Sequence, residues 1–197
     1  MNRRHFLGAA GALALGGGLP AVAQGGTRPM SRAAQHGWLP NVPLVGHDGR
    51  TYNFYDDLAR DKTFVLSFFV VACGEGRCPT ANFNLRKVQD MLGDRMGRDI
   101  FFYTVSLEPE KDTQPILKEY AEDILEAAPG WLFLTGKAGD IETLRRAQGF
   151  YDQDPERDRD VSNHSSMARV ICDRRERWGT ATLMTSPRNI YSVIRTL

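Results

Sequence analysis

The chain has 197 residues, of which 42% are hydrophobic and 25% are charged, which is enough to build one hydrophobic core. The 25 basic and 24 acidic residues nearly cancel, so the sequence lacks the basic excess of nucleic-acid-binding domains. We therefore expect a single globular domain and no nucleic-acid partner.

Residues 1–23 have the features of a twin-arginine export signal. Arg3 and Arg4 precede a stretch rich in Gly, Ala and Leu, and Ala21-Val22-Ala23 has the form of a cleavage site. The apolar stretch is shorter than the ~20 residues that a membrane-spanning helix needs, so we expect no membrane span after cleavage. These features predict a periplasmic protein, in an oxidising compartment, with a flexible mature N-terminus over residues 24–38.

From residue 39 to residue 197 the sequence has the patterns of a folded domain. Asp48-Gly49 lies between two short apolar segments, which is the signal for a β-hairpin turn. Residues 64–71 are apolar except for Ser67 and do not alternate, which is typical of a strand buried on both faces of a sheet. The sequence thus predicts an N-terminal hairpin followed by a central strand.

Two cysteines follow this central strand. Cys73 and Cys78 lie on a loop with two glycines, and Pro79 begins a helical pattern, so Cys78 is predicted at the N-cap. A helix N-terminus carries unpaired N–H groups and a partial positive charge, which favour thiolate over thiol. Because the thiolate is both a nucleophile and a metal ligand, the loop is a candidate for metal or redox chemistry.

Beyond this loop, helical and strand patterns alternate. Helices are predicted from Pro79 to Gly93, around residues 117–125 and over residues 141–150, and strands over residues 100–107 and 131–134. The inward face of the second of these helices is predicted to carry Leu117, Ala121, Ile124 and Leu125. This order implies right-handed crossovers and parallel strands.

The last part of the chain opens with a charged segment. Residues 151–163 contain five acidic residues and two arginines, which fits a solvated loop or a partner-recognition loop. His164 follows, then a strand over residues 167–172 in which Cys172 is expected to be a small core residue. Residues 178–182 are predicted to pair antiparallel with that strand, and Ser186-Pro187 to cap the last helix.

This order of elements is that of an α/β, thioredoxin-like domain with a mixed central sheet flanked by helices. Within that class the sequence resembles the Sco/SenC family of copper chaperones. The resemblance rests on the Cys73…Cys78-Pro79 loop, on the run from Val105 to Thr113, and on Asn163-His164-Ser165-Ser166. It implies an exported metallochaperone, rather than an enzyme, that helps assemble a copper protein such as a cytochrome c oxidase subunit.

The resemblance also implies the ligands. One copper ion would be bound by the sulfurs of Cys73 and Cys78 and by the imidazole of His164. Thiolates select Cu(I), and an imidazole completes a three-coordinate site that also accepts Cu(II). The other histidines, His5, His36 and His47, have no evident partners in the sequence.

The sequence departs from the family pattern in the spacer between the cysteines. Four residues separate Cys73 from Cys78, where the family has three. The extra residue costs only ~0.2 kcal/mol of loop-closure entropy. It can lengthen the path by ~3.5 Å, a change that the two glycines of the spacer could accommodate. Arg77 is also new and favours a Cys78 thiolate, whereas Glu108, where the family usually has Asp, is assigned no role beyond a solvated loop.

The cysteine pair has three other interpretations at this point. Cys73 and Cys78 could cycle between dithiol and disulfide in a thiol–disulfide oxidoreductase of the envelope. Against this, such enzymes use a two-residue spacer and carry a proline before the facing strand, where this chain has SNHSS. A peroxidase is disfavoured because Val70, Val71 and Ala72 stand where its threonine would be. A structural disulfide would explain both cysteines but not His164.

Overall fold

The central strand of the fold is β3 (Thr63–Phe69), as its unbroken apolar run predicted. In the computed structural model, which describes residues 29–74 and 76–197, β3 lies between β4 (Ile100–Ser106) and β6 (Met167–Cys172). Successive side chains of a strand point to opposite faces. Val65 and Phe69 therefore enter one core cluster and Phe64 and Leu66 the other.

The sheet has seven strands in the order β2-β1-β5-β4-β3-β6-β7. The strands β3, β4 and β5 (Trp131–Gly136) are parallel, whereas β6 runs antiparallel to β3 and pairs with β7 (Arg177–Thr182). The predicted N-terminal hairpin is formed by β1 (Pro43–Gly46) and β2 (Thr51–Asn53), and β1 also pairs with β5. The mixed, thioredoxin-like sheet that the sequence predicted is thus confirmed.

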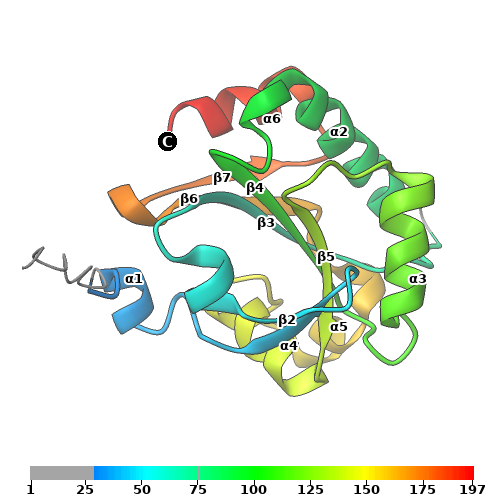
Figure 1. The fold of residues 1–197 in the computed structure, drawn as a ribbon. Coiled ribbons are helices and arrows are strands. Elements are labelled where there is room, and N and C mark those ends of the chain that lie inside the picture. Colours follow the sequence, from blue (N-terminus) through cyan, green and yellow to red (C-terminus); the bar gives the residue numbers. More distant parts are fainter. Residues whose placement is uncertain (1–28, 75) are drawn as a thin grey trace, which may run out of the picture.

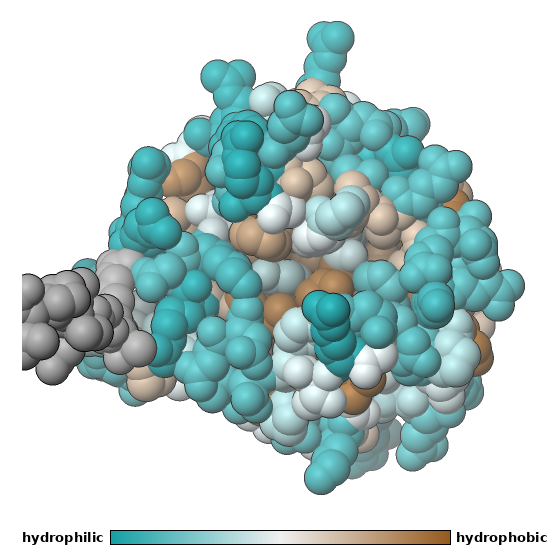
Figure 2. Space-filling model, in the orientation of Figure 1, coloured by the Kyte–Doolittle hydropathy of each residue, from teal (hydrophilic) through white to brown (hydrophobic). Residues whose placement is uncertain are grey.

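Helices cover both faces of this sheet (Figure 1). The helices α2 (Arg77–Leu92), α3 (Gln114–Glu119) and α6 (Pro187–Arg195) pack on one face through residues that include Leu85, Leu117 and Ile190. The π-helical segment η1 (Phe54–Ala59) and the helix α4 (Ala138–Ala147) pack on the other. Hydrophilic residues cover most of the face seen in Figure 2, and hydrophobic residues are exposed mainly near its centre.

Short helical segments complete the chain between these elements. They are α1 (Arg32–Gln35), η2 (Gly93–Arg95), η3 (Tyr120–Ile124), α5 (Pro155–Arg159), η4 (Val161–Asn163) and η5 (Asp173–Arg175). No helix in the described part of the chain is both long enough and apolar enough to cross a membrane. The proposed export signal lies outside the described residues.

The segment before residue 39 differs from its prediction as a flexible tail. Residues 31–38 pack on the domain, with Ala33 and Ala34 of α1 buried and the backbone N–H of Ser31 donating to the Tyr55 hydroxyl at 2.9 Å. Small alanines can join the core cluster that contains Tyr55 of η1 without a periodic apolar stripe. The sequence pattern therefore carried no signal for this contact.

The second predicted helix also differs in one position. The helix α3 continues as the π-helical η3, in which the N–H of Leu125 donates to the carbonyl of Tyr120, five residues earlier. A π-helical turn is wider than an α-helical one, so it shifts the phase of the side chains that follow. Leu117, Ala121 and Leu125 are buried as predicted, but Ile124 is exposed.

Candidate metal centre

The two-cysteine loop leaves the sheet at the carboxyl end of β3. Cys73 is partly buried in the loop, and Cys78 is buried in the first turn of α2. The sequence had suggested Cys78 as the N-cap. The N-cap is instead Gly76, with φ +68°, so Cys78 is the second residue of the helix. The helix starts earlier because a glycine can adopt this left-handed conformation at no steric cost.

The direction of β6 brings His164 to the same place. Because β6 runs antiparallel to β3, its first residues lie beside the end of β3, where Ala168 pairs with Ser67. His164 precedes β6 by three residues and therefore arrives next to the cysteine loop. Its Nε2 lies 3.1 Å from Sγ of Cys78, which confirms that the fold brings these two predicted residues into contact.

The second nitrogen of His164 fixes the tautomer. Nδ1 lies 2.8 Å from the carbonyl oxygen of Val161, and a carbonyl can only accept. Nδ1 therefore carries the proton, and the lone pair of Nε2 faces the Sγ of Cys78. An imidazole whose Nδ1–H is held by a backbone carbonyl is oriented to bind a metal through Nε2.

Burial decides the protonation of both groups. Burial raises the pKa of the Cys78 thiol to about 12, and the hydrogen bond with Cys73 adds to the shift. The nearby charge of Arg77 acts in the opposite direction but is the weakest of these effects. Burial likewise lowers the pKa of His164. Burial thus acts against the Cys78 thiolate that the position near a helix start predicted, since loss of hydration is the largest of these effects.

Cys73 lies near Cys78 and His164 but does not form a three-ligand metal site with them in the described part of the chain. Its hydrogen bond to Cys78 contributes to the raised pKa of that thiol, and both residues are thiols rather than a disulfide. Within residues 29–74 and 76–197, no three His, Cys, Asp or Glu side chains are grouped closely enough to hold a metal ion. The structure thus has Cys78 and His164 in contact, and Cys73 would have to move for all three to share one ion.

A buried acid that the sequence analysis did not single out supports the cysteine loop. The Asp112 side chain is only 2% exposed, and its Oδ2 accepts from the Ser106 hydroxyl at 2.5 Å and from the Val71 N–H at 3.1 Å. Asp112 thereby ties the end of β4 to the start of the cysteine loop. Glu108, in the same run, forms an ion pair with the exposed Lys111, but its own side chain is only 19% exposed, so it is less solvated than the sequence suggested.

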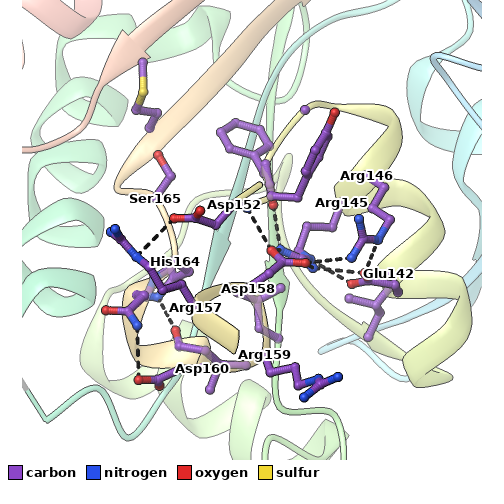
Figure 3. A pocket seen from close by; sticks show the side chains of 18 of the residues that line it. Glu142, Arg145, Arg146, Asp152, Arg157, Asp158, Arg159, Asp160, His164 and Ser165 are labelled. Atoms are coloured by element: carbon purple, nitrogen blue, oxygen red, sulfur yellow. Dashed lines mark hydrogen bonds and ion pairs between the residues drawn. The ribbon is translucent and has the colours of Figure 1, made fainter. Parts of the chain in front are cut away.

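The charged segment over residues 151–163 is not uniformly solvated. It contains the short helix α5, and the side chain of Asp158 is only 6% exposed, because Arg145 and Arg146 of α4 hold its carboxylate (Figure 3). Their hydrogen bonds, those from Arg145 above all, hold the pKa of Asp158 well below its usual range. The segment borders an open cavity of about 870 Å³ whose lining includes His164.

The remaining sequence candidates lie elsewhere. Cys172 is buried at the far end of β6, as expected of a core residue. His47, which had no evident partner, accepts at Nδ1 from the N–H of Phe133, and its carbonyl accepts from the side chain of Gln114. Burial lowers the pKa of His47. His36 contacts the ring of Trp38, and His5 lies outside the described residues.

Comparison with known proteins places this geometry in context. A family model described as SCO1/SenC matches residues 41–197. No curated protein sequence matches the chain.

Solved structures share the fold at low sequence identity. Bradyrhizobium japonicum ScoI with copper bound has a TM-score of 0.62 at 21% identity, over 79% of this chain and 96% of that one. A SCO1/SenC family lipoprotein from Bacillus anthracis has a TM-score of 0.65 at 21% identity, over 81% and 94% of the two chains. BsSco, a member of the Sco family of cytochrome c oxidase assembly proteins, has a TM-score of 0.60 at 19% identity, over 80% and 91%.

Proposed function

The chain belongs to the SCO1/SenC family, and we propose that it is an exported copper-binding metallochaperone that assists assembly of a copper enzyme such as cytochrome c oxidase. The observation that carries the proposal is the 3.1 Å contact between Cys78 Sγ and His164 Nε2, in the tautomer that offers Nε2 to a metal. The relatives named above, one with copper bound and one in a family of oxidase assembly proteins, support it.

Copper would be the cargo of this site and would bind to Cys73, Cys78 and His164. Two sulfurs and one imidazole form a soft donor set that suits Cu(I) and tolerates Cu(II). Binding requires Cys73 to move toward the Cys78–His164 pair, and its loop contains two glycines that can permit this. Transfer to the client would proceed by ligand exchange, with an incoming thiolate or imidazole replacing one ligand at a time.

We further propose that the domain works in the periplasm. The basis is the twin-arginine pattern of residues 1–23, which would be removed to leave residues 24–38 ahead of the domain over residues 39–197. Immunoblotting of cell fractions tests this directly. A shortened protein in the periplasmic fraction, lost when Arg3 and Arg4 are replaced by lysine, is the expected result, and retention in the cytoplasm contradicts it.

His164→Ala should weaken the binding of Cu(II) more than the binding of Cu(I). The imidazole is the harder of the proposed ligands, so its loss should weaken Cu(II) binding by about 10-fold or more, while Cu(I) stays bound through two sulfurs. Competition titrations with a chelator for each oxidation state measure both affinities. His36→Ala, which removes an imidazole in contact with Trp38, is the control and should change neither affinity. Equal Cu(II) affinity in the wild type and His164→Ala contradicts the ligand assignment.

The alternative is a thiol–disulfide oxidoreductase, which the hydrogen bond between Cys73 and Cys78 favours. Cys73 would be the attacking thiol, since burial keeps Cys78 protonated at neutral pH. This alternative expects reduction of insulin or of a partner disulfide that survives His164→Ala. The metallochaperone proposal expects no such catalytic reduction.

A further inference from the structure

The segment that delivers His164 is fastened to α4 by a partly buried ion pair between Asp158 and Arg145. Asp158 Oδ1 and Oδ2 accept from the two terminal nitrogens of Arg145 at 2.7 and 2.8 Å. The two side chains are 6% and 12% exposed. Such a two-bond contact between a guanidinium and a carboxylate fixes orientation as well as distance, unlike a single exposed ion pair.

Further hydrogen bonds complete this junction. Asp158 also accepts from Arg146 at 2.6 Å and from the backbone N–H of Asp152 at 2.9 Å, so its carboxylate is saturated. Arg145 donates to the carbonyl of Phe150 and to Glu142. Figure 3 shows these groups converging from α4 and from the segment over residues 151–163. The ion pair thus fastens that segment to a helix that packs on the sheet.

Short-range contacts link residues 160 and 161, which closely follow Asp158 in the chain, to residues 163 and 164. The backbone N–H of Asn163 donates to the carbonyl of Asp160, and the backbone N–H of His164 to that of Val161. The carbonyl of Val161, which lies only three residues after Asp158, also accepts from Nδ1 of His164. A shift of Asp158 would therefore move the carbonyl that orients the imidazole.

We propose that the Arg145–Asp158 ion pair is a positioning element for His164, which holds the Val161 carbonyl so that Nε2 faces Cys78. Its effect on copper rests on the proposed function above, whereas its effect on the imidazole does not. Neither residue contacts the copper ligands in the structure, so they act through the backbone of residues 158–161. The segment is therefore more than a solvated loop.

Asp158→Asn tests this inference in the metal-free, reduced protein. The amide keeps the shape of the side chain but loses the charge and one acceptor, so the two-bond contact is broken. By ¹⁵N NMR of the histidine side chain, we expect wild-type His164 to be almost entirely the Nδ1–H tautomer and the variant to shift toward Nε2–H. Arg145→Lys, which keeps the charge but not the planar fork, should shift it less.

The matched control is Glu156→Gln. Glu156 forms an ion pair of similar length with Arg159 in the same segment, but the two side chains are 79% and 73% exposed. This variant should leave the tautomer unchanged. An unchanged tautomer in both Asp158→Asn and Arg145→Lys, with only the melting temperature lowered, would show a purely structural ion pair and overturn the proposal.

Copper titration provides the second readout. Asp158→Asn should lower Cu(II) affinity about 10-fold, and by no more than His164→Ala does, because it acts only through the orientation of that imidazole. In the His164→Ala background the same change should have almost no further effect, because the residue through which it acts is gone. An equal loss in both backgrounds contradicts the inference. A tautomer shift in a protein that binds no copper would uphold the positioning role and reject the metallochaperone function.

Discussion

Cys78→Ser is expected to abolish tight Cu(I) binding. The substitution replaces a soft sulfur with a hard oxygen, and we expect the affinity to fall by about 10³-fold or more, equivalent to ~4 kcal/mol. The fold should survive, since a serine hydroxyl can still donate to Nε2 of His164 from the same buried position. Anaerobic titration of the reduced protein against a chromogenic Cu(I) chelator measures the affinity.

Cys172→Ser is the matched control for this experiment. Cys172 is also a buried thiol, but it pairs with Thr63 at the opposite end of β3 from the cysteine loop. It should retain one-to-one Cu(I) binding. Wild-type affinity in Cys78→Ser would remove Cys78 from the site and with it the metallochaperone proposal.

The same titration should depend on pH in a defined way. Since burial raises the pKa of Cys78 to about 12, this thiol is protonated throughout the range from pH 6 to pH 9. Copper must displace that proton, so the loss of one proton makes the apparent affinity rise tenfold for each pH unit. In a plot of the logarithm of apparent Cu(I) affinity against pH, the slope for Cys78→Ser should therefore be one less than the slope for the wild type. Equal slopes would mean that Cys78 releases no proton on binding.

The sequence predicted the sheet more reliably than the chemistry within it. The apolar run of β3 and the order of strands and helices follow from local patterns, which hold in the structure. The meeting of Cys78 and His164 depends on β6 running antiparallel beside β3, a long-range pairing that no local pattern encodes. Family resemblance, rather than periodicity, supplied that expectation.

Burial explains the remaining differences. The position of Cys78 near a helix start predicted a thiolate, but the neighbouring core that excludes water could not be seen in the sequence. Asp112 and Asp158 each lie in a run of charged residues that reads as solvated. Which acid of such a run is buried depends on donors from distant strands and helices, such as the Val71 N–H and the Arg145 guanidinium.

Asp112→Ala is expected to destabilise the protein more than any other substitution in the charged segment that follows β4. It would leave two donors without this acceptor, the buried Ser106 hydroxyl and the partly buried Val71 N–H. An unsatisfied buried donor costs about 1–3 kcal/mol, so the free energy of unfolding should fall by about 2–6 kcal/mol. Typical domains have ~5–15 kcal/mol in total. Urea unfolding monitored by circular dichroism measures the change.

Two variants show whether this loss comes from the buried acceptor. Asp112→Asn keeps one side-chain oxygen and should lose less, whereas Glu110→Ala, at an exposed position in the same run, should change stability by less than ~0.5 kcal/mol. Because the Val71 N–H begins the loop that carries Cys73, Asp112→Ala should also weaken Cu(I) binding at a urea concentration where the protein remains folded. Stability equal to that of Glu110→Ala would show that the link through Asp112 between β4 and the cysteine loop contributes nothing measurable to folding.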